Sequence, residues 1–454
     1  MTHAPAVLSF RGLAVCAGLA VLALWPMLIV TAPMVYFDTA AYASAGQQAL
    51  AMLFGSSGGP GIGGAAGGGG GLRSAAWSLS LVALGPVVLC WAQTWLTVVM
   101  LATLVPADVP SRRLAVAGGA LLITGLPWYA SYAMPDLLGA TVLAYYALLA
   151  GPYARVGMRW RLVLGLGASF AILGHYGHLP LAAVLAGAVG SVALVQRRVS
   201  WVLILAAVGP LILAVSVNVS VSLVLDRVTP QVAATAPTTT RLAPGRLPIL
   251  LARSLEDGPA RLHLEEACAR DLYRSCALLP DPLPDTVGAF LWSAETGIGG
   301  LLPAERRILR SEEMRIVLNA ARAYPGLQLT AVLGNTGRQL LHVGISEHLP
   351  RSAPGARVAL EDRTAYPALA LADRLVPLTV WAGAAALLVL FLLGRLPQGL
   401  GGPLAILVVG LLANAAIYGG LSYPVDRYQG RIAWIVPAFA LIAWLGPKRV
   451  APQR

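Results

Sequence analysis

Long apolar runs separated by short polar stretches dominate the pattern of this chain. A helix needs about 20 apolar residues to cross roughly 30 Å of hydrocarbon. The runs that reach or approach this length predict ten spans, near residues 12–34, 77–104, 114–131, 135–151, 162–174, 180–195, 200–224, 376–394, 402–421 and 431–446. The short runs 162–174 and 180–195 could instead form one re-entrant unit, so totals from 9 to 12 fit the pattern. The first run is longer than the apolar part of a signal peptide, and we expect it to be retained.

The composition agrees with an all-α polytopic membrane protein. Of the 454 residues, 57% are hydrophobic and only 11% are charged, whereas about 25% are charged in an ordinary soluble domain. This composition excludes a disordered chain and a small disulfide scaffold.

The distribution of the net charge of +12 along the chain predicts its orientation in the membrane. Lys and Arg accumulate in the cytoplasmic loops of membrane proteins. With the N-terminus inside, the cytoplasmic segments hold 12 Lys or Arg and a single acid, Asp108. We therefore expect a multi-pass protein of the bacterial inner membrane with both termini in the cytoplasm. Because the excess charge is spread over short loops, nucleic acid is not an expected partner.

The chain divides into three parts. Residues 1–225 form an N-terminal transmembrane module with a first periplasmic loop at 35–76, and residues 375–454 supply the last transmembrane helices. The segment 226–374 lies between them, is predicted to be periplasmic and mostly helical, and precedes the last three spans. Apolar residues at helical spacing predict helices over 304–324 and 327–341.

Two cysteines lie in this periplasmic segment. Cys268 and Cys276 are eight residues apart, and a disulfide is expected because the periplasm is oxidising. Two free thiols are the alternative. A metal site is less favoured, since His263 is the only histidine near them.

The first periplasmic loop has two features. Residues 39–54 predict an amphipathic helix lying at the membrane interface. Residues 55–71 are rich in glycine and predict a flexible tether, with a mobile lid as the alternative. They do not form a phosphate-binding loop, because no strand precedes them and no Lys-Ser or Lys-Thr pair follows.

Ionisable residues outside the 226–374 segment gather at one membrane face. Four separate turns at the outer ends of the predicted spans carry Asp38, Asp136, His175, His178, Asp426, Arg427 and Arg431. Ionisable groups at membrane depth are costly and tend to be functional. Their common depth predicts a single site.

Each of these residues also has a structural interpretation. Asp38 and Asp136 could cap the helices that follow them. His175 and His178 could be interfacial residues bonded to backbone carbonyls. Arg427 and Arg431 could anchor the last span at the interface, and the tyrosines and tryptophans at span ends resemble an aromatic belt.

The chain resembles the GT-C superfamily of polytopic glycosyltransferases, which use polyprenyl-phosphate-sugar donors. The resemblance rests on Asp38 and Tyr42 after the first span, Met134-Pro135-Asp136 at the start of a short span, and Asp426-Arg427-Tyr428 before the last helix. It covers mainly residues 12–200 and 400–446 and implies a GT-C-like fold.

The resemblance implies a role for each matching residue. Asp38 would be the general base that activates the acceptor. Arg427, Arg431 and Arg73 would stabilise the departing lipid phosphate, and His175 or His178 would contact the donor. Tyr42, Asp136 and Tyr428 are assigned to substrate binding.

The implied partners are a polyprenyl-phosphate-linked sugar donor, membrane lipids and a glycan or lipid acceptor. Several relatives carry a second acid where this chain has Thr39. No cofactor is therefore assigned, although a divalent metal stays possible.

Two other functions remain open. A lipid-linked glycan flippase or transporter would place polar groups along several spans, whereas Gln93, Asn218 and Asn414 are the clear polar residues within these spans. An O-antigen-type polymerase or ligase would use arginines of a large outer loop. The 17 Arg of 226–374 keep that possibility open, but 16 acids balance them.

Overall fold

The computed structural model describes residues 6–30, 33–54, 74–106, 109–235, 247–345 and 367–446. Within these ranges the chain is helical, and its one extended pairing is an isolated bridge between Met34 and Tyr132. The glycine-rich residues 55–71 and Arg73 lie outside the described residues.

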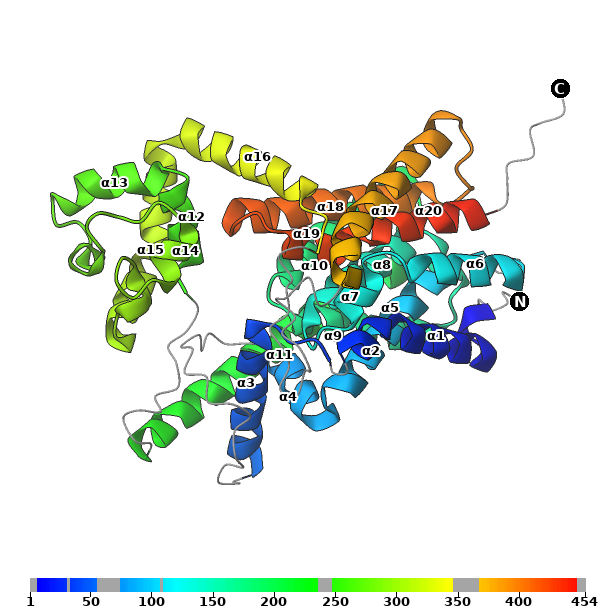
Figure 1. The fold of residues 1–454 in the computed structure, drawn as a ribbon, viewed down its shortest axis with the longest axis horizontal. Coiled ribbons are helices and arrows are strands. Elements are labelled where there is room, and N and C mark those ends of the chain that lie inside the picture. The colour runs from blue at the N-terminus through cyan, green and yellow to red at the C-terminus, as the bar shows by residue number, and fades with distance from the viewer. Residues whose placement is uncertain are drawn as a thin grey trace.

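The membrane part is a bundle of helices that lie roughly side by side (Figure 1). In chain order its helices are α1 (Phe10–Ala23), α2 (Trp25–Val30), α3 (Phe37–Phe54), α4 (Ala75–Leu84), α5 (Pro86–Thr103), α6 (Ser111–Leu121), α7 (Leu126–Ala130), α8 (Leu138–Ala150), α9 (Met158–Gly174), α10 (His178–Val195), α11 (Trp201–Thr235), α17 (Pro367–Leu392), α18 (Gly401–Leu421), α19 (Asp426–Ala433) and α20 (Ile435–Leu445). Every residue of α8 is buried, and α5, α9, α10 and α18 pack around it. The centre of the bundle is therefore α8.

Six helical stretches of the described chain are long and apolar enough to cross a membrane, which makes this a multi-pass membrane protein. They begin at Pro86, His178, Trp201, Ala370, Gly401 and Asp426. Each of the ten predicted spans coincides with a helix or with a pair of consecutive helices. Four of them contain none of these six stretches, and the count of ten crossings stays a prediction.

One interruption has a clear local cause. Gly85 adopts a positive φ of 75°, which ends α4, and Pro86 then occupies the first position of α5. Glycine tolerates this conformation, and proline suits the first turn of a helix because its missing N–H needs no partner there. The predicted span 77–104 is therefore two helices that meet at an angle.

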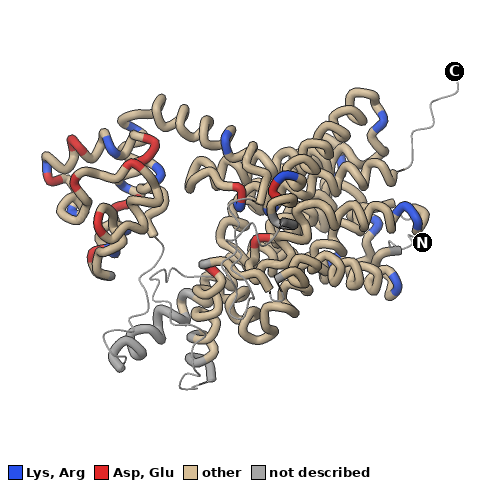
Figure 2. Tube along the Cα trace, viewed as in Figure 1, with Lys and Arg blue, Asp and Glu red and all other residues tan. Residues whose placement is uncertain are grey.

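The ends of the bundle differ in charge. One end carries several arginines, as Figure 2 shows beside the start of α1. We call this the arginine-rich end; its residues include Arg11, Arg112, Arg113, Arg155, Arg159, Arg161, Arg197, Arg198 and Arg395. Acids and arginines are mixed in the part of the chain beyond the opposite end.

That outer part has its own hydrophobic core. It is built from α12 (Ile249–Glu256), α13 (Pro259–Cys268), α14 (Val287–Trp292) and α15 (Pro303–Ala323). On α15, Leu309, Ile316 and Ala320 repeat at helical spacing and are fully buried in this core. The predicted helix 304–324 agrees with α15. Cys268 and Cys276 are joined by a disulfide, with Cα atoms 5.4 Å apart.

Helix α16 (Pro325–Leu341) connects the outer part to the bundle, because it packs along α18. It agrees with the predicted helix 327–341. Its polar residues Asn335 and Gln339 are fully buried, while Leu329 and Leu333 are 60% and 63% exposed. A helix that packs only against water shows the reverse pattern, so the polar face of α16 is the one that contacts α18.

Candidate functional site

The site begins with a short pairing between two segments that are distant in sequence. Met34 donates its N–H to Ser131 O at 2.9 Å, and Ala133 donates to Met34 O at 2.9 Å. Cys90 and Gln93 of α5 hold the same strand-like segment by bonding to the carbonyl oxygen of Tyr132. This pairing places the start of α3 beside the turn that precedes α8.

Each of the two segments contributes one carboxylate. Asp38 lies in the first turn of α3, and Asp136 lies in a short 3₁₀ helix, Pro135–Leu137, that leads into α8. Neither occupies the N-cap position that the sequence allowed for it, and both carboxylates instead bond to arginines.

The third contribution comes from α19. Arg427 donates from Nε to Asp136 Oδ1 at 3.1 Å and from Nη2 to Asp136 Oδ2 at 3.0 Å, and its Nη1 donates to Asp38 Oδ2 at 3.0 Å. The guanidinium carbon also lies 4.3 Å from the ring centroid of Tyr36. Arg427 therefore joins α3, α19 and the turn before α8.

Arg431 follows one turn later on α19. Its Nη1 donates to Asp136 Oδ1 at 3.3 Å, and its guanidinium carbon lies 4.2 Å from the ring centroid of Tyr418. Its Nε and Nη2 are buried and have no hydrogen-bond partner among the residues that the structure describes. Arg431 thus retains donors for an anionic group that would enter here.

These four side chains form a buried, electrically balanced cluster. Exposed fractions are 8% for Asp38, 3% for Asp136, 6% for Arg427 and 0% for Arg431. Burial of charge is tolerated only when opposite charges and hydrogen bonds compensate it. Because Arg427 and Arg431 are buried inside the protein, they do not anchor the last span among lipid headgroups.

The two histidines lie next to this cluster, at the turn between α9 and α10. His178 is fully buried, and its Nδ1 donates to Ala171 O at 2.8 Å. Its Nε2 then carries a lone pair, and this buried atom has no partner within the described part of the chain. Nδ1 of His178 therefore bonds to a backbone carbonyl, as the structural interpretation expected. Nε2 is available as an acceptor.

His175 contacts the site through Tyr418. Its Nδ1 accepts from Gly177 N–H at 3.0 Å, and the hydroxyl of Tyr418 lies 3.3 Å from the same atom. A Cβ at Gly177 would overlap the hydroxyl of Tyr418, so only glycine fits this turn.

The remaining predicted residues are also near. Tyr42 lies one turn after Asp38 on α3 and is 2% exposed within the main hydrophobic core. Tyr428 stacks on Tyr418, with ring centroids 4.6 Å apart. The structure thus brings together the two carboxylates, the two arginines, the two histidines and Tyr428. The chemical roles of these residues stay predictions.

Sequence reasoning missed the residues that support α19. Gln339 of α16 donates to Val425 O at 2.8 Å and accepts from Val425 N–H at 3.0 Å. Asp426 receives Gly344 N–H and lies 3.3 Å from His342 Nδ1. These contacts come from the outer part of the chain, and no local motif marks them.

The cluster is a set of alternating charges, with two carboxylates facing two guanidinium groups. Across the described residues, no three His, Cys, Asp or Glu side chains lie together as metal ligands would. The arrangement can bind an anion through arginine donors and can accept a proton on Asp38. No protein-family model, curated protein or solved structure matches the chain.

Proposed function

We propose that the protein is a glycosyltransferase of the bacterial inner membrane, with both termini in the cytoplasm and its site on the periplasmic side. It would move a sugar from a polyprenyl-phosphate donor to a lipid- or envelope-linked acceptor. One observation carries the proposal: Asp38, Asp136, Arg427 and Arg431 form a single buried cluster although they come from three distant parts of the chain.

The chemistry assigns one step to each charge. The Asp38 carboxylate takes the proton of the acceptor hydroxyl or amine while that atom attacks the anomeric carbon. The bond from this carbon to the phosphate oxygen breaks, and polyprenyl phosphate leaves with the electron pair. Arg427 and Arg431 stabilise the charge that develops on the phosphate, as preorganised donors do well.

The ion pair between Arg427 and Asp38 would keep Asp38 from acting as the base until the donor binds. While Arg427 Nη1 donates to Asp38 Oδ2, a lone pair of that oxygen is engaged by the arginine rather than by the acceptor. Donor phosphate would compete for Arg427 Nη1, which is the arginine atom bound to Asp38. Asp136 would keep the arginine in place through its two bonds, as a positioning residue.

Two of the three polar residues named within the spans support transfer at this site over transport. Gln93 is buried and bonded to Tyr132 O, while Asn414 bonds to Tyr428 O at 2.7 Å and to Gln429 Oε1 at 2.8 Å. Both therefore support segments of the candidate site. They do not mark a path along the bundle, which a transporter would need.

Arginines of the outer part are less suited to a polymerase or ligase role. Arg253 is 3% exposed and is paired with Glu256 and Asp257. Arg261 is paired with Asp285, and Arg315 with Glu312. Such pairs neutralise charge that a polymerase of this type would direct at its glycan.

The test uses purified full-length protein in lipid nanodiscs. Undecaprenyl phosphate carrying different radiolabelled hexoses and pentoses is the donor, a bacterial envelope-lipid extract is the acceptor, and released undecaprenyl phosphate is measured. Loss of a general base lowers such rates by about 10²- to 10⁴-fold, so Asp38→Asn should be nearly inactive. Asp285→Asn, the same change at a 94% exposed side chain, is the control.

An Asp38→Asn variant that keeps the wild-type rate would contradict the assigned base. If the wild type released undecaprenyl phosphate from none of the donors, the proposed reaction would be contradicted.

A further inference from the structure

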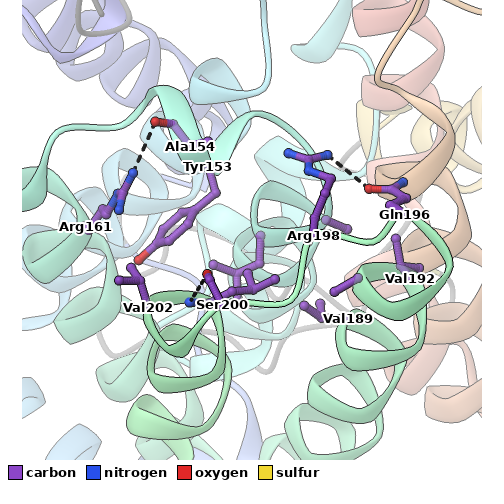
Figure 3. Close-up of a pocket in the computed structure, with 13 residues that line it drawn as sticks. Tyr153, Ala154, Arg161, Val189, Val192, Gln196, Arg198, Ser200 and Val202 are labelled. Carbon is purple, nitrogen blue, oxygen red and sulfur yellow. Dashed lines mark hydrogen bonds between the residues drawn. The ribbon is translucent and has the colours of Figure 1, made fainter.

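A pocket lies at the arginine-rich end, at the opposite end of α8 from Asp136 and its partners. Its cavity has a volume of about 250 Å³. It lies between the ends of α8 and α10 and the start of α11, and Figure 3 shows its lining. The lining residues are Leu149, Ala150, Tyr153, Ala154, Arg161, Val189, Val192, Ala193, Gln196, Arg198, Ser200, Val202 and Leu203.

The lining contains positive charge and no carboxylate. Arg161 and Arg198 lie on either side of Tyr153 in Figure 3. Arg161 donates to Val156 O at 2.7 Å and to Ala154 O at 3.1 Å. These acceptors are neutral and hold the side chain without cancelling its charge.

Arg198 is held in a similar way. It donates to Gln196 Oε1 at 3.0 Å and to Gly151 O at 3.3 Å. A guanidinium has five N–H donors, so both arginines retain N–H groups after these bonds. Two fixed cations over one cavity are suited to a phosphate, whose oxygens accept several charge-assisted bonds.

The position of the pocket indicates where that phosphate comes from. The cavity lies where the apolar stretch of α10 ends, at Val195, and where that of α11 begins, at Trp201. Val195 is 85% exposed and Trp201 is 80% exposed. Exposed tryptophan at the end of a span marks the headgroup layer of a membrane.

From these observations we infer that the pocket between Arg161 and Arg198 binds the phosphate of an anionic membrane lipid. The headgroup enters the cavity, and the acyl chains extend along the exposed apolar faces of α10 and α11. The cavity is smaller than the roughly 300 Å³ at which drug-sized pockets begin, which fits a headgroup better than a whole soluble ligand. This inference does not depend on the proposed sugar transfer.

The test measures binding of dioleoylphosphatidylglycerol to the purified full-length protein in neutral detergent by native mass spectrometry. Loss of charge-assisted hydrogen bonds should weaken binding at least about tenfold in Arg161→Gln/Arg198→Gln. The matched control is Arg155→Gln/Arg159→Gln, which removes the same charge from exposed neighbours outside the lining and should bind like the wild type.

A second variant separates loss of the pocket from loss of folding. Val202→Trp fills the cavity mouth, keeps both arginines and should also bind about tenfold more weakly, with an unfolding temperature near that of the wild type. Dioleoylphosphatidylcholine, which has no net charge, should bind less tightly than the phosphatidylglycerol.

Two results would overturn the inference. Equal phosphatidylglycerol binding by the wild type, the double Gln variant and Val202→Trp would exclude this pocket as the site. Inorganic phosphate that binds as tightly as the lipid would assign the pocket to a soluble anion.

Discussion

Arg427 meets Asp136 side-on, with Nε 3.1 Å from Oδ1 and Nη2 3.0 Å from Oδ2. This bidentate geometry fixes the plane of the guanidinium. The remaining terminal nitrogen, Nη1, is thereby directed at Asp38, 3.0 Å away. The position of Asp136 thus determines that Nη1 is the nitrogen of Arg427 that bonds to Asp38. Substitutions can test the partners in this set separately.

Asp136→Asn should destabilise the protein strongly. The change leaves Arg427 and Arg431 buried with one carboxylate between them, and breaking a buried ion pair costs about 3–5 kcal/mol. Asp136→Asn/Arg431→Gln restores the balance of charge and should recover part of this loss. Unfolding in bicelles measures both variants, and a double variant less stable than Asp136→Asn would show that charge balance is not the cause.

Arg427→Lys should reduce sugar transfer while it keeps the positive charge. An ammonium cannot form two parallel bonds to Asp136 and a third to Asp38, so Lys would lose the fixed direction of Nη1. We expect at least about a tenfold lower rate of undecaprenyl phosphate release, which corresponds to roughly 1.4 kcal/mol of lost transition-state stabilisation. Arg374→Lys, at an exposed arginine of α17, is the control and should keep the wild-type rate.

The positions of the helices could be predicted from the sequence because apolar runs determine them locally. The breaks could be anticipated only in part. Pro86 and Gly85 are visible in the sequence, but the positive φ of Gly85 that turns α5 away from α4 appears only in the structure. A hydropathy pattern sums over a run of residues and is insensitive to one such angle.

The predicted topology also placed the site residues together. It did not predict which of them would form hydrogen bonds with one another. The predicted depth in the membrane placed Asp38, Asp136 and Arg427 at one face. Packing of α19 on α8 and the pairing of Met34 with residues 131–133 decide which carboxylate receives two bonds. Tyr418 and Gln339 were missed for the same reason. Their roles depend on contacts with residues far away in the chain, which leave no spacing pattern in the sequence.

Stability of the outer part should depend on pH through Glu312. Burial raises the pKa of this carboxyl, but N–H groups of Ser275 and Arg274 and the charge of Arg315 outweigh burial and lower it overall. The pKa of Glu in an unfolded chain is about 4.3. A lowered folded pKa means that the contribution is complete above this value and is lost as the pH falls through the folded pKa.

Thermal unfolding of the wild type and of Glu312→Gln between about pH 6 and pH 3 measures this contribution. The wild type should be the more stable protein at the upper end, and the difference should shrink as the pH falls. A difference that stays constant over the whole range would mean that the ionised carboxylate contributes nothing to stability.

Gly419→Ala should separate the outer part from the bundle. A Cβ at this position would lie 2.6 Å from the carbonyl oxygen of Asn335 and 2.9 Å from Cβ of Gln339. The first of these is a backbone atom, so α16 itself would have to move away from α18. Such overpacking costs about 1–3 kcal/mol.

The consequence should extend to the candidate site. Displacement of α16 would loosen the two bonds between Gln339 and Val425, which hold the start of α19 two residues before Arg427. Gly187→Ala on α10 is the matched control, because no atom lies within 4 Å of its added Cβ. That control should be neutral, or more stable by up to about 1 kcal/mol from helix propensity. If Gly419→Ala equalled Gly187→Ala in both unfolding and sugar transfer, the close contact of α16 with α18 would not position Arg427.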